Sequence, residues 1–408
     1  MQAARCGQAD DPSMSKVKTQ RRCKPTGGRG RGAASVADEP VPALEMEGFE
    51  PEVETSAGQQ DQVAGAVRYA WLGAGQCGGR LVKAFHDLGY RKLLAVNTTR
   101  RDLDLLDVPA GQKLLMDIGA EGAGKDMERG RGAVDQYDQE ILHRMEEIVG
   151  HDADHIMVCF GAGGGTGSGS AAGLVELARR YARSIGLKDP ARRVGVMMTL
   201  PTAGESSSPR VAQNAYTVAS ELSLLAWQNK LSPLVIVDND KIRHVHPNLT
   251  VKQFWPTVNR TVAGLFDVFN RLSYRPSEYT TFDPTDYYSI IMAGGCAVMG
   301  LTQVRDYRDK FAISRAIKQN LEQTLLAGQF DLSRAKVAGS IIVGGRRMME
   351  TVPGLQDAID FGFDILADIT GQATVHRGIY EDNREVLRVY TILGGLPAPT
   401  ARLEQLRR

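Results

Sequence analysis

The chain has 408 residues, a formal net charge of +1 and 42% apolar residues, which are the values of an ordinary soluble globular protein with two or three domains. Its five cysteines are odd in number and scattered, and no pair has metal-ligand spacing, which favours reduced thiols in the cytoplasm. The longest apolar stretch, Ser289 to Leu301, is too short to span a bilayer and predicts a core strand. No apolar segment follows the twin arginines Arg21-Arg22, which argues against secretion.

Residues 1–64 are predicted to form a disordered tail. Its charged residues are mostly Lys and Arg as far as Gly32 and are all acidic from Ala33 to Asp61, with few aromatic residues and no apolar period. The basic part could contact nucleic acid or anionic lipid, or the tail could have no specific partner. The second interpretation is the commoner one for block-charged tails, so no specific nucleic-acid partner is predicted.

From Val67 onward, apolar strands alternate with amphipathic helices, which is the pattern of a mostly parallel sheet covered on both faces. The predicted strands of this first part are 67–72, 92–96, 156–160, 194–199 and 234–237, and its helices are 78–88, 128–149, 169–185 and 211–229. A long helix over 251–272 comes next. A second unit then begins near residue 287, with a strand, a helix at 305–326, a strand at 337–343, a helix at 355–366 and strands at 373–375 and 386–393.

The most informative segment is the glycine run Gly161–Gly169, which lies between a predicted buried strand and an amphipathic helix. Glycines let backbone N–H groups crowd around an anion, and the following helix adds the positive end of its dipole. Thr166 and Ser168 can add hydroxyl donors. A flexible Gly/Ser linker is the alternative, but a linker has no reason to lie between these two elements. Because no Gly-Lys-Ser/Thr follows, the run is not a Walker loop.

A second glycine loop, Gly73 to Gly79, follows the first predicted strand and matches the dinucleotide pattern G-x-G-x-x-G. An NAD(P)-dependent oxidoreductase is therefore an alternative. That fold requires an acidic residue about twenty positions later, where this chain has Asn97-Thr98-Thr99. Two glycine loops at neighbouring strand ends favour a mononucleotide with several phosphates.

These segments resemble the tubulin/FtsZ superfamily in kind and in order, from about Val67 to Leu396. The run 161–169 resembles its signature GGGTG(T/S)G. The other matching segments are Gly75-Gln76-Cys77-Gly78, Leu94 to Thr98, Gly122-Ala123-Gly124-Lys125-Asp126, Thr199-Leu200-Pro201 with Glu205 and Arg210, and Val237 to Lys241. Two departures stand out: Lys125 replaces a glycine, where it either faces the terminal phosphate or faces solvent, and Arg210 is one residue farther from Glu205 than in the family.

The resemblance implies binding of GTP or GDP with Mg²⁺, and it assigns no metal-ligating residue. The nucleotide-binding residues that it implies are Gly75, Gln76, Cys77, Asn97, Gly122, Ala123, Gly124, Gly163, Gly164, Gly165, Thr166, Gly167, Ser168, Glu205, Arg210 and Asn239. On the long helix, Trp255 and Asn259 lie four residues apart on one face. By resemblance they stack on guanine and hydrogen-bond to it, and an amide suits that base because it both donates and accepts. The alternative is a core tryptophan and a surface asparagine.

After the long helix, Asp283-Pro284-Thr285-Asp286 resembles the catalytic loop of FtsZ, with the same three-residue spacing of its carboxylates. In the family this loop completes the nucleotide site of the next subunit in a filament, where Asp283 and Asp286 would orient the attacking water. A helix N-cap or a turn is the alternative that the composition also suits.

The resemblance implies an α/β fold with a Rossmann-like GTPase domain on a parallel sheet, a long central helix and a smaller α+β C-terminal domain. The boundaries that we expect are a tail at 1–64, the GTP-binding domain at 65–250, the central helix and catalytic loop at 251–286, the C-terminal domain at 287–398 and a short tail at 399–408. It further implies a cytoplasmic GTPase, activated when it assembles with itself head-to-tail, with a role in cell division or cell shape. The end of the chain lacks the peptide by which FtsZ proteins dock on membrane-tether partners, so no such partner is assigned. A non-hydrolysing paralogue that modulates other filaments stays open as the alternative.

Overall fold

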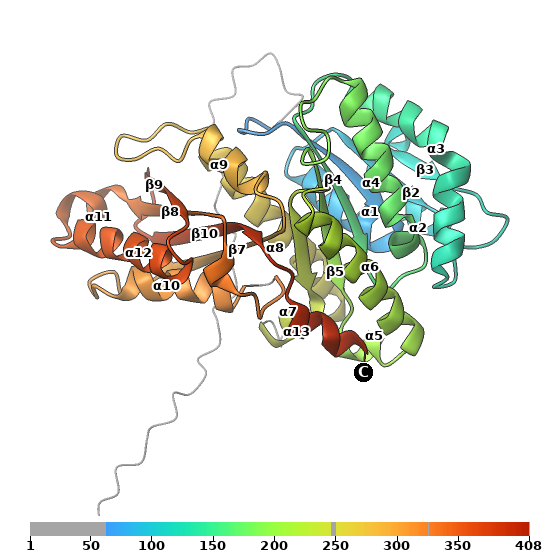
Figure 1. The fold of residues 1–408 in the computed structure, drawn as a ribbon. Coiled ribbons are helices and arrows are strands. Elements are labelled where there is room, and N and C mark those ends of the chain that lie inside the picture. Colours follow the sequence, from blue (N-terminus) through green and yellow to red (C-terminus); the bar gives the residue numbers. More distant parts are fainter. Residues whose placement is uncertain (1–62, 246–249, 325, 408) are drawn as a thin grey trace, which may run out of the picture. The chain divides into compact units, whose positions relative to one another are not determined.

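The computed structural model describes residues 63–245, 250–324 and 326–407, so the predicted tail lies outside the described residues except for its last two positions. The strands of this part form one sheet, in the order β3-β2-β1-β4-β5-β6-β7-β10-β8-β9 (Figure 1). Their bounds are Tyr69–Ala74 (β1), Leu93–Asn97 (β2), Lys113–Leu115 (β3), His155–Gly161 (β4), Val194–Leu200 (β5), Leu234–Asp238 (β6), Cys296–Val304 (β7), Val337–Gly345 (β8), Thr374–Asp382 (β9) and Leu387–Leu396 (β10).

The first six strands are all parallel, as the alternation of strands and helices predicted. Only two residue pairs, Leu234↔Cys296 and Val235↔Ala297, join β6 to β7, and these strands are also parallel. Beyond this junction β10 runs antiparallel to both β7 and β8, and β8 pairs in parallel with β9. A parallel sheet thus continues into a smaller mixed one, which confirms the predicted α/β fold class.

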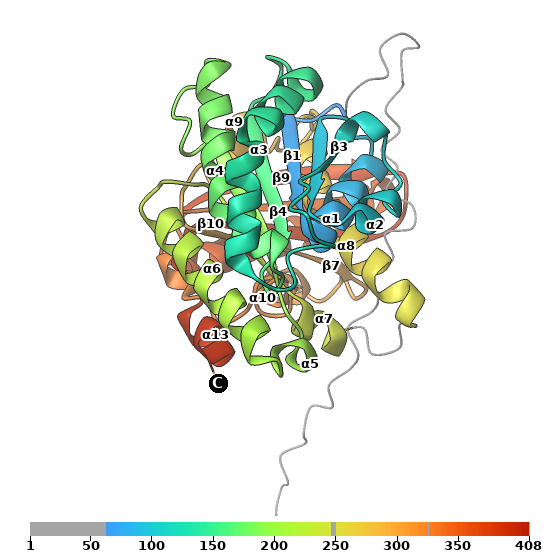
Figure 2. The ribbon, with the colours of Figure 1, turned by 90° about the vertical axis from the view of Figure 1, so that its right-hand side faces the viewer.

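Helices cover both faces of the sheet, which buries all six residues of β1 (Figure 2). On one face, α3, α4, α6, α10 and α12 enclose one hydrophobic core, and on the other α1, α8 and α9 enclose a second. The helices are Gly75–Asp87 (α1), Arg100–Asp104 (α2), Met127–Val149 (α3), Thr166–Ser184 (α4), Ala203–Ser206 (α5), Pro209–Trp227 (α6), Asn239–Val245 (α7), Val251–Leu272 (α8), Pro284–Ile291 (α9), Ala312–Glu322 (α10), Arg346–Thr351 (α11), Leu355–Ile369 (α12) and Thr400–Glu404 (α13).

The long helix α8 has the predicted bounds and packs against strands of both parts of the sheet. Its Phe266 ring meets Trp71 of β1 edge-on at 5.9 Å, and its Phe269 ring meets Tyr390 of β10 at 6.3 Å. All four rings are almost fully buried. Because such aromatic contacts add to the area buried, α8 links the two halves through one continuous apolar core.

The prediction of one core strand from Ser289 to Leu301 was wrong at its beginning. Residues up to Ile291 complete α9, and β7 begins only at Cys296. Gly294 and Gly295 have φ values of 76° and 57°, in the left-handed region that glycine adopts without a steric penalty. They turn the chain between the two elements. An apolar run alone does not distinguish a buried helix end from a buried strand.

One buried histidine makes the stability of the fold sensitive to acid. His155, the first residue of β4, is 0% exposed, and neither ring nitrogen has a hydrogen-bond partner among the described residues. Burial, with a smaller contribution from the Arg193 charge, lowers its pKa to about 3. The unfolded chain therefore takes up a proton below about pH 6.5, whereas the folded chain does not until about pH 3.

We expect the free energy of unfolding to fall by about 2 kcal/mol more between pH 7.5 and pH 5 in the wild type than in a His155→Leu variant. Urea unfolding at the two pH values measures this difference. An equal fall in both proteins would mean that His155 does not carry the effect.

Candidate functional site

A cavity of about 520 Å³ lies at the carboxyl ends of the parallel strands, where ligands bind in open α/β sheets. Its walls are the loops that follow β1, β2, β4 and β5, the 121–125 segment, the first residue of α7 and the start of α8. The cavity brings together every nucleotide-binding residue expected from the sequence except Ser168 and Arg210. Both Trp255 and Asn259 of α8 belong to the lining.

The two predicted glycine loops meet backbone to backbone at the floor of this cavity. Gly75 has a φ of 69°, and a Cβ atom on it would lie 3.2 Å from the backbone nitrogen of Gly167. Helices α1 and α4 begin at Gly75 and Thr166, and both of these residues line the cavity. Two helix N-termini with unpaired N–H groups are therefore directed at one space, an arrangement that suits a phosphate chain.

A third loop, Gly122 to Asp126, packs against the second glycine loop. A Cβ atom on Gly165 would lie only 2.6 Å from the backbone nitrogen of Asp126, so the two backbones need a glycine there. The amide nitrogen of Asn214 on α6 donates to the carbonyl oxygens of Lys125 and Gly164, at 2.9 and 3.3 Å. Asn214 thereby ties both loops together, a role that its local sequence does not reveal.

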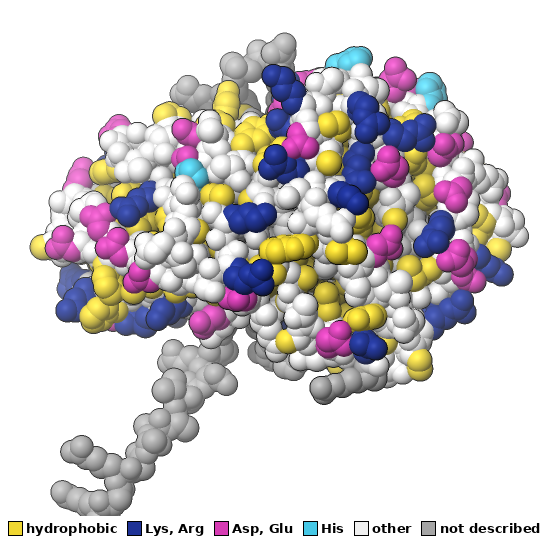
Figure 3. Space-filling view, in the orientation of Figure 1, with side chains coloured by type: hydrophobic (Ala, Val, Ile, Leu, Met, Phe, Trp, Pro, Cys, Tyr) yellow, Lys and Arg dark blue, Asp and Glu magenta, His cyan; other side chains and the backbone are white. Residues whose placement is uncertain are grey.

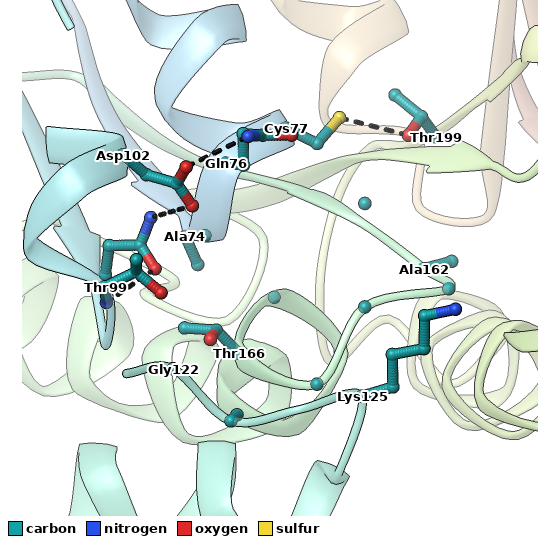
Figure 4. A pocket seen from close by; sticks show the side chains of 18 of the residues that line it. Ala74, Gln76, Cys77, Thr99, Asp102, Gly122, Lys125, Ala162, Thr166 and Thr199 are labelled. Carbon is teal, nitrogen blue, oxygen red and sulfur yellow. Dashed lines mark hydrogen bonds between the residues drawn. The ribbon is translucent and has the colours of Figure 1, made fainter. Parts of the chain in front are cut away.

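Lys125 supplies a cation to the cavity wall, with its backbone at a φ of 63°. Figure 4 shows its side chain on the same side of the cavity as Gly122, while Gln76 and Asp102 lie on the other side. Lys125 is exposed as well as lining the cavity, so its position suits both a phosphate and solvent.

Asp102 is a cavity residue that the sequence analysis missed. The acid absent from Asn97-Thr98-Thr99 comes instead from the following short helix α2. Its carboxylate accepts hydrogen bonds from the side-chain amides of Gln76, at 3.0 Å, and Asn97, at 3.3 Å (Figure 4). Asp102 therefore holds two predicted nucleotide residues in place beside the first glycine loop.

The cavity lining also includes two buried amides and an indole. Asn239 is 4% exposed and Asn259 is 7% exposed, and the side-chain oxygen of Asn239 has no hydrogen-bond partner among the described residues. Trp255 is half-buried and packs edge-on against Phe254 at 5.0 Å. Because buried polar atoms are almost always paired, this part of the lining is suited to a polar, planar ligand.

Two of the expected nucleotide residues lie outside the cavity lining. The hydroxyl of Ser168 is turned to the backbone and donates to the Ala162 carbonyl at 2.7 Å. Arg210 pairs with Asp126 at 3.4 Å, and its side chain is 59% exposed. Ser168 thus stabilises the glycine loop through its backbone, and Arg210 forms an ion pair with Asp126, the N-cap residue of α3.

Two further residues of the cavity lining, Glu205 and Cys77, have side chains that make contacts within the protein. Glu205 completes a capping box with Thr202 at the start of α5. The Cys77 thiol lies 3.2 Å from the Thr199 hydroxyl, and burial raises the pKa of this thiol. Cys77 is therefore a neutral, hydrogen-bonded lining group at neutral pH.

The two expected catalytic acids stand at the start of α9 and form its capping box. The Asp286 N–H donates to the Asp283 carboxylate at 2.9 Å, and the Asp283 N–H donates to the Asp286 carboxylate at 3.1 Å. The helix-cap alternative is thus realised in the structure. It leaves free lone pairs on each carboxylate, so capping and catalysis are compatible.

Helix α9 lies at the amino ends of the strands whose carboxyl ends form the cavity. The Ser232 hydroxyl, just before β6, donates to the Ile291 carbonyl at 2.6 Å, and the Arg193 guanidinium, just before β5, lies 5.2 Å from the Tyr288 ring centre. The seven residues of β5 span about 20 Å between these contacts and the cavity. Figure 1 shows α9 and α5 at opposite ends of the sheet. The acids therefore cannot reach the cavity of their own chain.

The described part of the chain holds no group of three or more metal-ligating side chains. Within the described ranges, no helix has both the length and the apolar character needed to cross a membrane.

The glycine loops, the two helix N-termini and the buried amides define the class of a nucleotide-binding α/β protein. Residues 68–247 match the model of the Tubulin/FtsZ family, GTPase domain. The tubulin-like protein CetZ of Pyrococcus abyssi is 26% identical over 338 residues, covering 81% of this chain and 86% of the relative. The cell division protein FtsZ 2 of Haloferax volcanii is 23% identical over 364 residues, covering 87% and 82%.

Solved structures agree at the level of the fold. The GTPγS-form protofilament of TubZ from Bacillus thuringiensis serovar israelensis has a TM-score of 0.71 at 18% identity, covering 84% of this chain and 91% of that one. The GTPγS-bound protofilament of CetZ2 from Haloferax volcanii has a TM-score of 0.67 at 22% identity, covering 83% and 97%. Residues 68–247 therefore have the sequence of a Tubulin/FtsZ-family GTPase domain, and over most of its length the chain is similar to FtsZ and CetZ proteins.

Proposed function

We propose that this protein binds GTP in the cavity and hydrolyses it to GDP and phosphate after it has assembled head-to-tail into filaments. The observation that carries the proposal is the placement of the cavity and of the α9 acids at opposite ends of the same strands. Each subunit then presents half of a hydrolytic site at either end. A contact between unlike ends does not close on itself, so it propagates a filament.

In this proposal the phosphates lie against the glycine loops and the N-termini of α1 and α4, with Lys125 beside them. A bound Mg²⁺ would supply positive charge beside the phosphates, in addition to the backbone N–H groups of the glycine loops and Lys125. The base lies between Trp255 and the amides of Asn239 and Asn259. The similar TubZ and CetZ2 structures are GTPγS forms, which supports a guanine nucleotide as the ligand.

Hydrolysis needs an oriented water at the terminal phosphate, and the cavity lining itself contains no carboxylate fixed for this task. Of the three lining carboxylates, Asp102 is bound to Gln76 and Asn97, Glu205 is bound in its capping box, and Glu121 is exposed on the 121–125 segment. The Asp283 and Asp286 carboxylates of a neighbouring subunit would supply the missing groups. Carboxylates at this position orient and polarise the water without forming a covalent intermediate.

The cellular role that we propose is cytoplasmic, in cell division or in the control of cell shape, with the chain itself as its principal partner. Relatives named as cell division and tubulin-like proteins support this range. A non-hydrolysing paralogue that binds GTP and modulates other filaments is the second candidate. It is favoured by one observation, since Asp286 is already held by its own chain through the capping box and His376.

The nucleotide test is competition of labelled GTP by unlabelled GTP and ATP. We expect ATP to compete far more weakly, because a site built around the guanine edge leaves its own polar groups unpaired with adenine. Asn259→Ala should weaken GTP binding roughly 10- to 100-fold, the effect of losing hydrogen bonds to a buried amide. The matched control is Arg260→Ala, the next residue on α8, which is exposed and outside the cavity lining. Equal competition by ATP and GTP would contradict the assignment.

A further inference from the structure

The side chains of Asp286, His376 and Ser289 form a hydrogen-bonded triad that joins α9 to β9. His376 Nδ1 lies 2.6 Å from Asp286 Oδ1, and His376 Nε2 lies 2.9 Å from Ser289 Oγ. The His376 and Asp286 side chains are each 21% exposed. The histidine thus binds a serine and a carboxylate on one face of α9, at the end of the molecule opposite to the cavity.

The positions of the protons in this triad follow from whether each atom can donate or accept a hydrogen bond. An ionised carboxylate only accepts, so the Nδ1 atom of His376 carries a proton that points at Asp286. The Ser289 hydroxyl also lies 2.7 Å from the backbone carbonyl of Asp286, to which it can only donate. With that proton committed to the backbone, the Ser289 oxygen accepts from Nε2–H, so this arrangement holds His376 with a proton on both ring nitrogens and leaves Ser289 unactivated as a nucleophile.

The two contacts fix the Asp286 carboxylate and leave it usable. One oxygen accepts from His376 and the other from the backbone N–H of Asp283. A carboxylate offers about four lone-pair sites, so each oxygen keeps one for a further donor. The Asp283 carboxylate differs, because its residue is exposed and, among the described residues, it accepts only the capping-box hydrogen bond from the Asp286 N–H. Of the two acids, Asp286 is the one whose direction is set by another part of the fold.

We propose that His376 is a positioning residue that holds Asp286 in the orientation from which it directs water at the nucleotide of the next subunit. This inference rests on the proposed function of the α9 acids. Because His376 acts through Asp286 and does not touch the nucleotide, its loss should lower kcat while the KM for GTP and the assembly of filaments stay near the wild-type values.

Three substitutions separate positioning from simple structural support. In His376→Asn the side-chain amide nitrogen takes the place of Nδ1 and can still donate to Asp286. In His376→Gln the amide reaches the place of Nε2 and can bind Ser289 only. In His376→Ala both contacts are lost. The control is Arg377→Ala, the next residue on β9, whose guanidinium points to Asp360 on α12 at 3.8 Å.

We expect turnover per assembled subunit to fall roughly 10- to 100-fold in His376→Ala and His376→Gln, and His376→Asn and the control to stay close to the wild type. Pelleting and GTP affinity, measured on the same preparations, should not change. Equal turnover in the Asn and Gln variants, an unaltered His376→Ala, or a parallel loss of assembly and turnover would each overturn the positioning role. Wild-type filaments that do not hydrolyse GTP would instead overturn the proposed function, and the positioning role with it.

Discussion

Replacing Asp286 by Asn should give a protein that binds GTP and assembles but turns it over at least about 100-fold more slowly, the loss associated with a missing general base or water-orienting group. The substitution removes the charge and keeps an amide oxygen that can accept from the Asp283 N–H, so the capping box of α9 survives in part. Filaments of the variant should persist longer, because GTP stays at their interfaces. Phosphate release and pelleting from one reaction measure both effects.

Thr285→Ala is the matched control for this substitution. It lies between the two acids in the first turn of α9, is exposed, and donates none of the capping hydrogen bonds. Its turnover should equal that of the wild type. If Asp286→Asn filaments hydrolysed GTP at the wild-type rate, the acids of α9 would be helix caps and nothing more.

Gly164→Asp should abolish GTP binding, and with it hydrolysis and nucleotide-dependent assembly. Gly164 is exposed, lines the cavity and has room for a side chain, since the nearest atom to a Cβ placed on it is the Gly161 carbonyl oxygen at 3.8 Å. The fold should therefore tolerate the change, while the new carboxylate repels the phosphates across a short distance. Equilibrium binding of labelled GTP measures the loss.

The uncharged variant Gly164→Asn separates repulsion from bulk, because its side chain has almost the same size. We expect it to retain much more GTP binding than Gly164→Asp. If both variants bound GTP as tightly as the wild type, the phosphates would not lie against this loop.

Local patterns predicted the part of the site that depends on backbone conformation. A glycine run between a buried strand and an amphipathic helix predicts an anion-binding loop, and Gly163, Thr166 and Gly167 of this run do line the cavity. The parallel sheet and α8 followed from periodicity for the same reason. The β7 boundary did not, because apolar residues continue through the Gly294-Gly295 turn.

Side chains that reach the site from elsewhere in the fold were not predictable in this way. Asp102 enters the cavity because the short helix α2 turns back over β2, and no periodic pattern marks that turn. His376 follows Ser289 by 87 positions and meets it only because β9 lies beside α9 in the folded chain. Ser168 shows the converse, since its hydroxyl donates to the Ala162 carbonyl and the residue lies outside the cavity lining.

The most direct measurement of a shared hydrolytic site is the activity of a mixture of Asp286→Asn and Gly164→Asp subunits. The first variant has an intact cavity and a defective α9, and the second has a defective cavity and an intact α9. If each site is built from two subunits, phosphate release should reappear in the mixture, at interfaces where the cavity of one variant meets the α9 of the other. A mixture no more active than its two components, while labelled subunits of both kinds pellet together, would contradict the shared site.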